Sequence, residues 1–174
     1  MTLVVRLAYT AAPMRSTESL TTSYAAQAQE LARLISEVPA EIVARQPNDN
    51  HWSVLQIVGH LADAELLAAV RLRRIIAQDR ANLFGYQQEV WADRLSYQQR
   101  KLETVVARFT LLREGNADLL AGLKADCWNL TGSHNEYGVL SLRQLVEDYV
   151  DHTAKHLDQI RRTVADLRPV SLER

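Results

Sequence analysis

Two histidines, His152 and His156, stand four residues apart in a segment whose apolar residues recur at helical spacing. On a helix, residues four apart lie on one face, one turn from each other, close enough to share a metal ion. Both fall within the apolar stripe of the segment, whose other members are Leu142, Leu145, Tyr149, Ile160, Val164 and Leu167. Burying two imidazoles costs free energy unless their nitrogens find partners. The pair therefore indicates either a metal site or two core histidines bonded to neighbouring carbonyls or carboxylates.

His60 is the candidate for a third ligand. It falls within another segment of helical periodicity, on a mostly apolar face that it shares with Ile57 and Ala64. A single histidine there would usually be a core residue, but with the pair it completes a set of three imidazoles. Three imidazoles with one open position suit a catalytic metal site, because water or substrate can take the fourth position. We therefore predict that His60, His152 and His156 bind one metal ion.

The ligand set does not identify the ion, because imidazole binds zinc, nickel, copper and iron alike. Zinc is the default by availability, and nickel, iron and manganese are alternatives. Two carboxylates could orient the ligand rings: Asp63 and Asp148 each lie on the helix face of one of these histidines. Asp63 is also a candidate base. The alternative for both is a solvated charge. His51 and His134 lie in predicted loops, where we expect surface or capping roles.

Four segments carry apolar residues at helical spacing, and they predict an all-α four-helix bundle. They span about residues 17–38, 53–78, 97–124 and 141–168. Ser53 with Gln56, and Ser141 with Gln144, have the spacing of capping boxes at the starts of the second and fourth segments. Ser96 is expected to cap the third. No segment shows the alternation of a strand.

The connection from Asp79 to Arg94 is long and carries two aromatic residues, Tyr86 and Trp91. Connections of this length without periodicity of their own are often functional, so we expect this one to cover part of the bundle. Residues 125–140 form the other substantial loop of the predicted fold.

Composition limits the classes of function. The chain has 174 residues, 47% of them hydrophobic, which suits one domain with a core. The formal net charge of −1, with mixed signs, gives no electrostatic case for nucleic acid or an anionic membrane. No apolar run reaches the length of a membrane span. The single cysteine, Cys127, excludes an internal disulfide framework and fits a reducing compartment, so we expect a cytoplasmic protein.

The predicted domain organisation is an N-terminal extension over residues 1–16, a bundle domain over 17–168 and a tail over 169–174. The stretch from Met1 to Pro13 lacks the basic region and long apolar core of a secretory signal. Met14 is an alternative start, with the preceding residues an upstream extension.

Two stretches resemble a known family. Residues 52–65, WSVLQIVGHLADAE, resemble the second-helix signature of the DinB/YfiT-like proteins. Residues 134–142, HNEYGVLSL, running into the later His-x-x-x-His-Leu-x-Gln-Ile, resemble the C-terminal signature of the same family. Trp91, Phe109 and Arg113 also fall where the family tends to have such residues. The resemblance covers about residues 17–167.

This resemblance implies an up-down-down-up bundle, a divalent metal held in the core by the three histidines, and a frequent homodimer. It also implies a family divided in function. Some members transfer low-molecular-weight thiols such as bacillithiol, mycothiol or glutathione, a related branch isomerises maleylpyruvate with mycothiol, and many have no assigned activity.

Three functional hypotheses follow. In the first, the metal binds a thiol cofactor as thiolate, which attacks a small electrophile under the connection 79–94. Arg71, Arg74 or Arg113 could then bind a carboxylate of the thiol, the alternative being ordinary salt bridges. In the second, metal-activated water makes the protein a hydrolase, with Asp63 or Glu65 as base. In the third, the protein is a non-enzymatic stress-response module, although three ligands are fewer than a closed structural site uses.

Overall fold

Four long helices form the bundle in the computed structural model, which describes residues 15–168. They are α1 (Thr17–Ser36), α2 (Val54–Gln78), α4 (Leu102–Ala121) and α5 (Leu142–Leu167). The predicted tail, the alternative start at Met14 and nearly all of the predicted extension lie outside the described residues.

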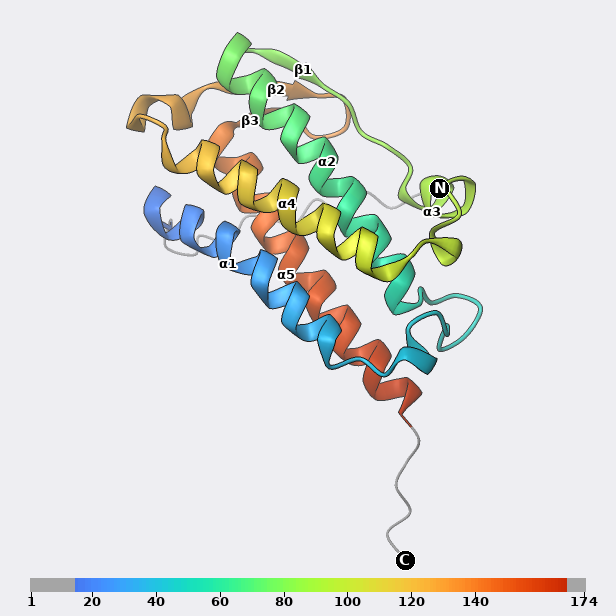
Figure 1. Cartoon of the computed structure of the whole chain (residues 1–174). Coiled ribbons are helices and arrows are strands. Elements are labelled where there is room, and N and C mark those ends of the chain that lie inside the picture. Colours follow the sequence, from blue (N-terminus) through green and yellow to red (C-terminus); the bar gives the residue numbers. More distant parts are fainter. Residues whose placement is uncertain (1–14, 169–174) are drawn as a thin grey trace, which may run out of the picture.

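The helices do not pack in the order of the chain. α4 and α5 each pack against both α1 and α2, so α1 and α2 lie on a diagonal of the bundle. Figure 1 shows that α2 and α4 run in the same direction, opposite to α1 and α5. The up-down-down-up arrangement is therefore confirmed. It requires a long crossover between α2 and α4 to bring the chain back to the start of a parallel helix.

Local sequence determines where the helices begin. Both predicted capping boxes are present, with Ser53 and Gln56 at α2 and with Ser141 and Gln144 at α5. The prediction that Ser96 caps the third helix is wrong. Ser96 has a left-handed backbone (φ 52°) and precedes a separate 3-10 turn at Tyr97–Gln99, so α4 begins only at Leu102.

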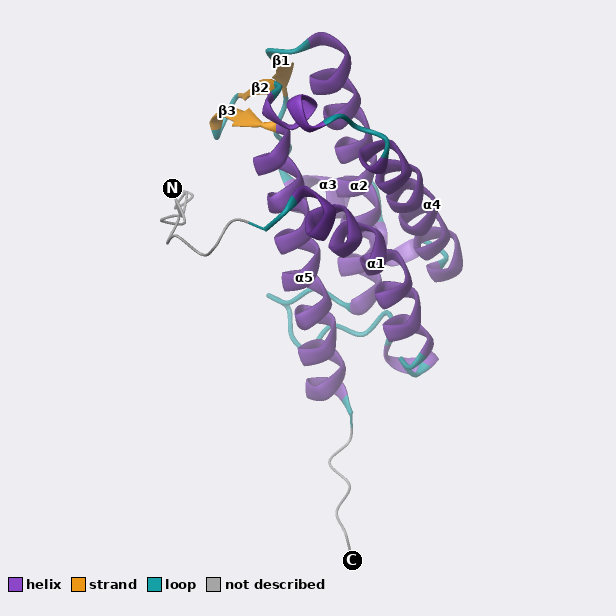
Figure 2. Cartoon of the chain, turned by 90° about the vertical axis from the view of Figure 1, so that its left-hand side faces the viewer, coloured by secondary structure: helices purple, strands orange, loops and turns teal. Residues whose placement is uncertain are grey.

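The expectation of a chain without strands is also wrong. Three short strands, β1 (Ala81–Leu83), β2 (Thr131–His134) and β3 (Gly138–Ser141), form a sheet at one end of the bundle (Figure 2). β1 pairs with β2 in parallel and β2 with β3 antiparallel. Strands of three or four residues are too short to show alternation in sequence. The crossover between α2 and α4 contains β1 and a short helix, α3 (Gln88–Arg94).

The core consists of two apolar clusters separated by a polar layer. One cluster lies at the sheet end and includes Leu72, Trp128 and Leu145; the other includes Phe109 and Leu157. On each long helix, buried polar side chains fall between the residues of the two clusters. Among the described residues, no helix is both long enough and apolar enough to cross a membrane.

Candidate metal centre

The three predicted histidines meet inside the bundle. His60 comes from α2, and His152 and His156 come from successive turns of α5. Nε2 of His152 lies 3.0 Å from Nε2 of His60 and 3.2 Å from Nε2 of His156. One nitrogen from each ring lies within 4.8 Å of the others. His60 is fully buried, while the other two rings are half-buried, so the site is open on the α5 side.

These distances fit one shared metal ion. Zinc binds imidazole nitrogen at about 2.0–2.1 Å, so two nitrogens of one tetrahedral site lie about 3.3 Å apart. The two Nε2 separations, 3.0 and 3.2 Å, are close to that edge length. The donor set, three imidazole nitrogens, is also one that zinc and neighbouring divalent metals accept.

Two of the rings have a hydrogen-bond partner on the side that faces away from the centre. Nδ1 of His156 lies 2.7 Å from Oε1 of Gln159, an acceptor, so Nδ1 carries the proton and Nε2 presents a lone pair. Nδ1 of His60 lies 3.1 Å from the hydroxyl of Tyr86. Each neutral ring can present an Nε2 lone pair to the centre, and one cation there would accept all three.

Burial keeps the rings neutral, which is the form that binds metal. Burial lowers the pKa of His60 to about 3, with a further contribution from His156. Burial also lowers the pKa of His152 well below its ordinary value, and the neighbouring histidines act in the same direction. The pKa of His156 is lowered by burial as well, although the hydrogen bond that it donates to Gln159 opposes this.

An aromatic wall stands beside His60. The ring of Trp52 lies 5.3 Å from that of His60, and the ring of Tyr86 lies 6.1 Å from it on a stacked plane. Trp91 in turn packs on Tyr86, with their centroids 4.5 Å apart. Tyr86 and Trp91 belong to the crossover, so this connection does cover part of the bundle, as its length and aromatic residues predicted.

The two carboxylates that were expected to orient the histidines, Asp63 and Asp148, form no hydrogen bond with them among the described contacts. Asp63 accepts a hydrogen bond from the hydroxyl of Tyr97 at 2.7 Å and pairs with Arg108, also at 2.7 Å. Asp148 is exposed on α5. Tyr86 and Gln159 occupy the orienting positions that we had expected carboxylates to fill. A signal for Gln159 was present in the sequence, because it stands one helical turn after His156.

Glu65 and Arg113 also need correction. Both are wholly buried and bonded to each other, with Arg113 Nη1 2.6 Å from Glu65 Oε2. Arg113 Nε donates to the carbonyl of Tyr24 at 3.0 Å, and Nη2 donates to Gln27. Neither side chain is free to act as a base or to bind the carboxylate of a thiol. Arg113 is also no surface salt bridge, which was the alternative.

His134 differs from its prediction too. It was expected in a surface loop, but it lies in β2 and is only 4% exposed. His51 is exposed and bonded to Asn48, as expected of a loop residue.

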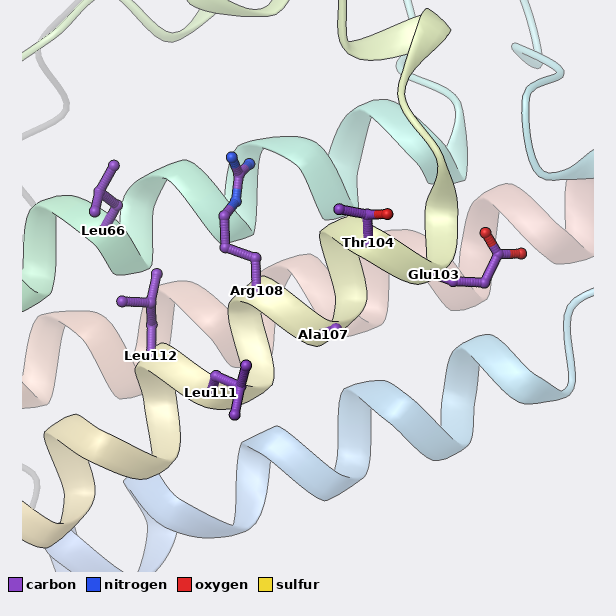
Figure 3. A pocket seen from close by; sticks show the side chains of 7 residues that line it. All are labelled: Leu66, Glu103, Thr104, Ala107, Arg108, Leu111 and Leu112. Carbon is purple, nitrogen blue, oxygen red and sulfur yellow. The ribbon is translucent and has the colours of Figure 1, made fainter.

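A surface hollow lies away from the histidines. It has a volume of about 740 Å³ and lies on the outer faces of α2 and α4 (Figure 3). It is lined by Leu66, Glu103, Thr104, Ala107, Arg108, Leu111 and Leu112. None of the three histidines contributes to it.

Comparison with known proteins relates the chain to one family. The family model of the DinB superfamily matches residues 23–160. A protein of Oceanobacillus iheyensis named "Putative metal-dependent hydrolase" is 25% identical over 136 residues, which cover 76% of this chain and 78% of that protein. A protein of the same name from Halalkalibacterium halodurans is 22% identical over 116 residues, covering 67% of each.

A solved structure shares the fold. YfiT from Bacillus subtilis superposes with a TM-score of 0.80 at 18% identity, covering 89% of this chain and 91% of that one. YfiT is described as "a probable metal-dependent hydrolase with an unusual four-helix bundle topology".

Proposed function

This chain belongs to the DinB superfamily, and we propose that it is a metal-dependent hydrolase of small molecules. His60, His152 and His156 would hold one divalent metal, with zinc as the default and nickel, iron or manganese as alternatives. The observation that carries the proposal is the convergence of the three rings, with Nε2 separations of 3.0 and 3.2 Å. A divalent metal supplies Lewis acidity there, which lowers the pKa of a water or a thiol that it binds.

The residues of this chain would have three tasks. All three ligands are neutral, so the chain adds no negative charge that would weaken the Lewis acid. Gln159 and Tyr86 hold the Nδ1 sides of two rings and so fix their orientation. Trp52 and the crossover aromatics shield the His60 ring from water, while the rings on α5 stay partly exposed.

The hydrolase proposed here uses no carboxylate base from Asp63 or Glu65. Both are engaged by other side chains, Asp63 by Tyr97 and Arg108, and Glu65 by Arg113. A proton released at the site would therefore pass to solvent on the open side.

The lack of a carboxylate base near the histidines supports a second candidate, which is the transfer of a low-molecular-weight thiol to a small electrophile. A thiol that is deprotonated at a metal needs no general base, and no described carboxylate serves the histidines as one. Arg113 would not be the residue that binds the thiol, since it is buried in the core.

An assay of purified, untagged protein loaded with zinc distinguishes the candidates. A panel of uncharged p-nitrophenyl esters tests hydrolysis, and a panel of thiols with an aromatic chloride as electrophile tests transfer. We expect ester hydrolysis that is lost on chelation, restored by zinc and absent in His152→Ala. Metal-dependent thiol transfer without hydrolysis would favour the second candidate. Neither activity, in a protein that binds metal, would favour a non-enzymatic module.

We also propose that the protein is a homodimer. The hollow on α2 and α4 has exposed apolar side chains, with Leu111 70% exposed, and the adjacent Val70 is 49% exposed. Apolar side chains gathered in this way on one face favour association of like surfaces. Sedimentation velocity should give twice the chain mass, and Leu111→Glu should reduce it to the mass of one chain. A single-chain mass for the unmodified protein would contradict the proposal.

A further inference from the structure

Two buried N–H groups near the crossover have no acceptor among the described residues. They are Nε of Arg71, on α2, and Nε2 of His134, on β2. Nδ1 of His134 accepts the backbone N–H of Glu136 at 3.2 Å, so in the neutral ring the proton sits on Nε2. Buried donors without acceptors are rare in folded proteins, because each costs the free energy of its lost hydration. Both groups therefore require an acceptor from outside the described chain.

Arg71 also lacks a counter-charge. Its Nη1 donates to the hydroxyl of Tyr149 at 2.9 Å, and its Nη2 donates to the carbonyl of Phe84. Both acceptors are neutral, and no described carboxylate forms an ion pair with Arg71. A half-buried guanidinium without a carboxylate is an uncompensated charge, which a bound anion would neutralise.

The sheet register brings the two residues to the same level of α2. Gly132 and His134 are the inward-facing residues of β2, two apart. A Cβ on Gly132 would lie 3.0 Å from Ile75, so Gly132 sits against that turn of α2. Arg71 is one helical turn before Ile75, and His134 is two residues beyond Gly132. Burial lowers the pKa of His134, and the nearby charge of Arg71 lowers it further.

Both partners of Arg71 stand close in the chain to residues of the histidine site. Tyr149, which binds Arg71, stands one turn before His152 on α5. Phe84, whose carbonyl binds Arg71, stands two residues before Tyr86, whose hydroxyl reaches His60. The segment from Phe84 to Tyr86 therefore contacts Arg71 at one end and His60 at the other.

We propose that Arg71 and His134 bind a carboxylate group of the substrate, with one oxygen on Arg71 Nε–H and the other on His134 Nε2–H. One positive charge and two N–H donors match one negative charge and two oxygens. The reacting part of the same molecule would extend along the crossover to His60, His152 and His156. That extension rests on the proposed function, whereas the carboxylate site itself requires no metal.

The test follows the imidazole resonances of His134 by NMR in protein with ¹⁵N-labelled histidine. The His134→Gln variant assigns these resonances by their loss. Acetate, phosphate and uncharged acetamide are titrated at constant ionic strength, into metal-free and zinc-loaded protein. We expect a saturable shift with acetate in both forms and none with acetamide. Arg71→Gln should weaken acetate binding at least about tenfold.

Two controls keep the result specific. Arg80→Gln removes the same charge at an exposed position just beyond the end of α2 and should leave acetate binding unchanged. Arg71→Lys keeps the charge but removes the Nε donor, and it should also weaken acetate if the donor matters. Circular dichroism and zinc content show whether each variant has folded.

Three results would overturn the carboxylate site: no saturable shift with acetate, equal affinity in Arg71→Gln, or saturation by phosphate alone. Because the metal-free arm does not depend on any reaction, failure of the hydrolase assay would leave an acetate shift standing. Loss of the acetate shift would likewise leave metal-dependent hydrolysis untouched.

Discussion

The bundle buries two polar clusters of opposite kind within a few helical turns of each other. Around Arg113 and Glu65, every charged group has its partner inside the protein. Glu65 accepts from Arg113 at 2.6 Å, from Asn116 at 2.7 Å and from Tyr24, and Arg113 lies over the Tyr24 ring at 3.6 Å. At the histidines, by contrast, ring nitrogens face one another at 3.0 and 3.2 Å, and Nδ1 of His156 donates outward to Gln159.

This difference separates a structural cluster from a candidate site. In the Arg113 network, donors and acceptors balance, so nothing more is required to hold it. At the histidine site, three ring nitrogens lie within 4.8 Å of one another, and His156, whose Nδ1 donates to Gln159, offers the centre only an acceptor. A cation at the centre would be shared by all three rings, whereas no such ligand fits the Arg113 network. The two clusters should therefore respond differently to mutation, acid and metal.

The largest expected effect is on the balanced cluster. Arg113→Met removes one partner of a buried pair and leaves Glu65 as an uncompensated charge, which should cost about 3–5 kcal/mol of unfolding free energy. Urea unfolding measures the loss. The double variant Arg113→Met/Glu65→Leu should recover part of it, because no charge then remains unpaired. A loss below about 1 kcal/mol in the single variant would show that the network matters little.

Acid should act on the histidine cluster next. The folded-state pKa of His60 is about 3, against 6.5 for an ordinary histidine. As pH falls, the unfolded chain binds the proton before the folded chain does. The contribution of His60 to the unfolding free energy of the metal-free protein is therefore fully present above pH 6.5 and is lost as pH decreases toward 3. Each such histidine contributes a slope of up to about 1.4 kcal/mol per pH unit.

Urea unfolding of metal-free protein at several pH values between 7 and 5 measures this slope. Replacing His60 with Asn should flatten the curve, because one proton fewer separates the two states. Equal slopes in the two proteins would mean that His60 is already protonated in the folded state.

A smaller effect is expected from the residue that orients His156. Gln159→Leu removes the acceptor at 2.7 Å from Nδ1, and zinc affinity should fall about 10- to 100-fold. Gln29→Leu, at an exposed position of α1, is the matched control and should bind zinc like the unmodified protein. Competition with a chromophoric chelator measures both. Equal affinity in the two variants would remove Gln159 from the site.

The smallest effect should come from Tyr86→Phe, which removes only a hydroxyl at 3.1 Å from His60. We expect a loss of zinc affinity of about tenfold or less, since the buried ring stays held by its neighbours. Tyr137→Phe, at an exposed tyrosine, serves as the control. A loss larger than that of Gln159→Leu would reverse the ranking of the two orienting residues.

Local patterns in the sequence were sufficient to find the four long helices and the three histidines, but not the start of α4 or the short helix α3. Capping boxes at Ser53 and Ser141 located two helix starts, and helical spacing placed His60 and the α5 pair on inward faces. The sheet was missed because β1 pairs with β2 some 50 residues away, and strands this short carry no pattern of their own.

The sequence also did not predict which side chains of neighbouring helices would contact each other. Periodicity places Glu65 and Arg113 on faces of α2 and α4, but it does not say which residues of the neighbouring helices they meet. Glu65 was therefore considered as a base and Arg113 as an anion ligand, whereas in the fold each neutralises the other. The role of Asp63 was missed for the same reason, since Tyr97 and Arg108 come from distant segments.

The most direct test of the metal site is the metal content of protein purified without a histidine tag or nickel resin, compared between the unmodified chain and His60→Ala. Elemental analysis should find one divalent metal per chain in the first and none in the second, with both proteins folded by circular dichroism. No metal in either protein, even after incubation with zinc, would make the three histidines core residues and contradict the proposed function.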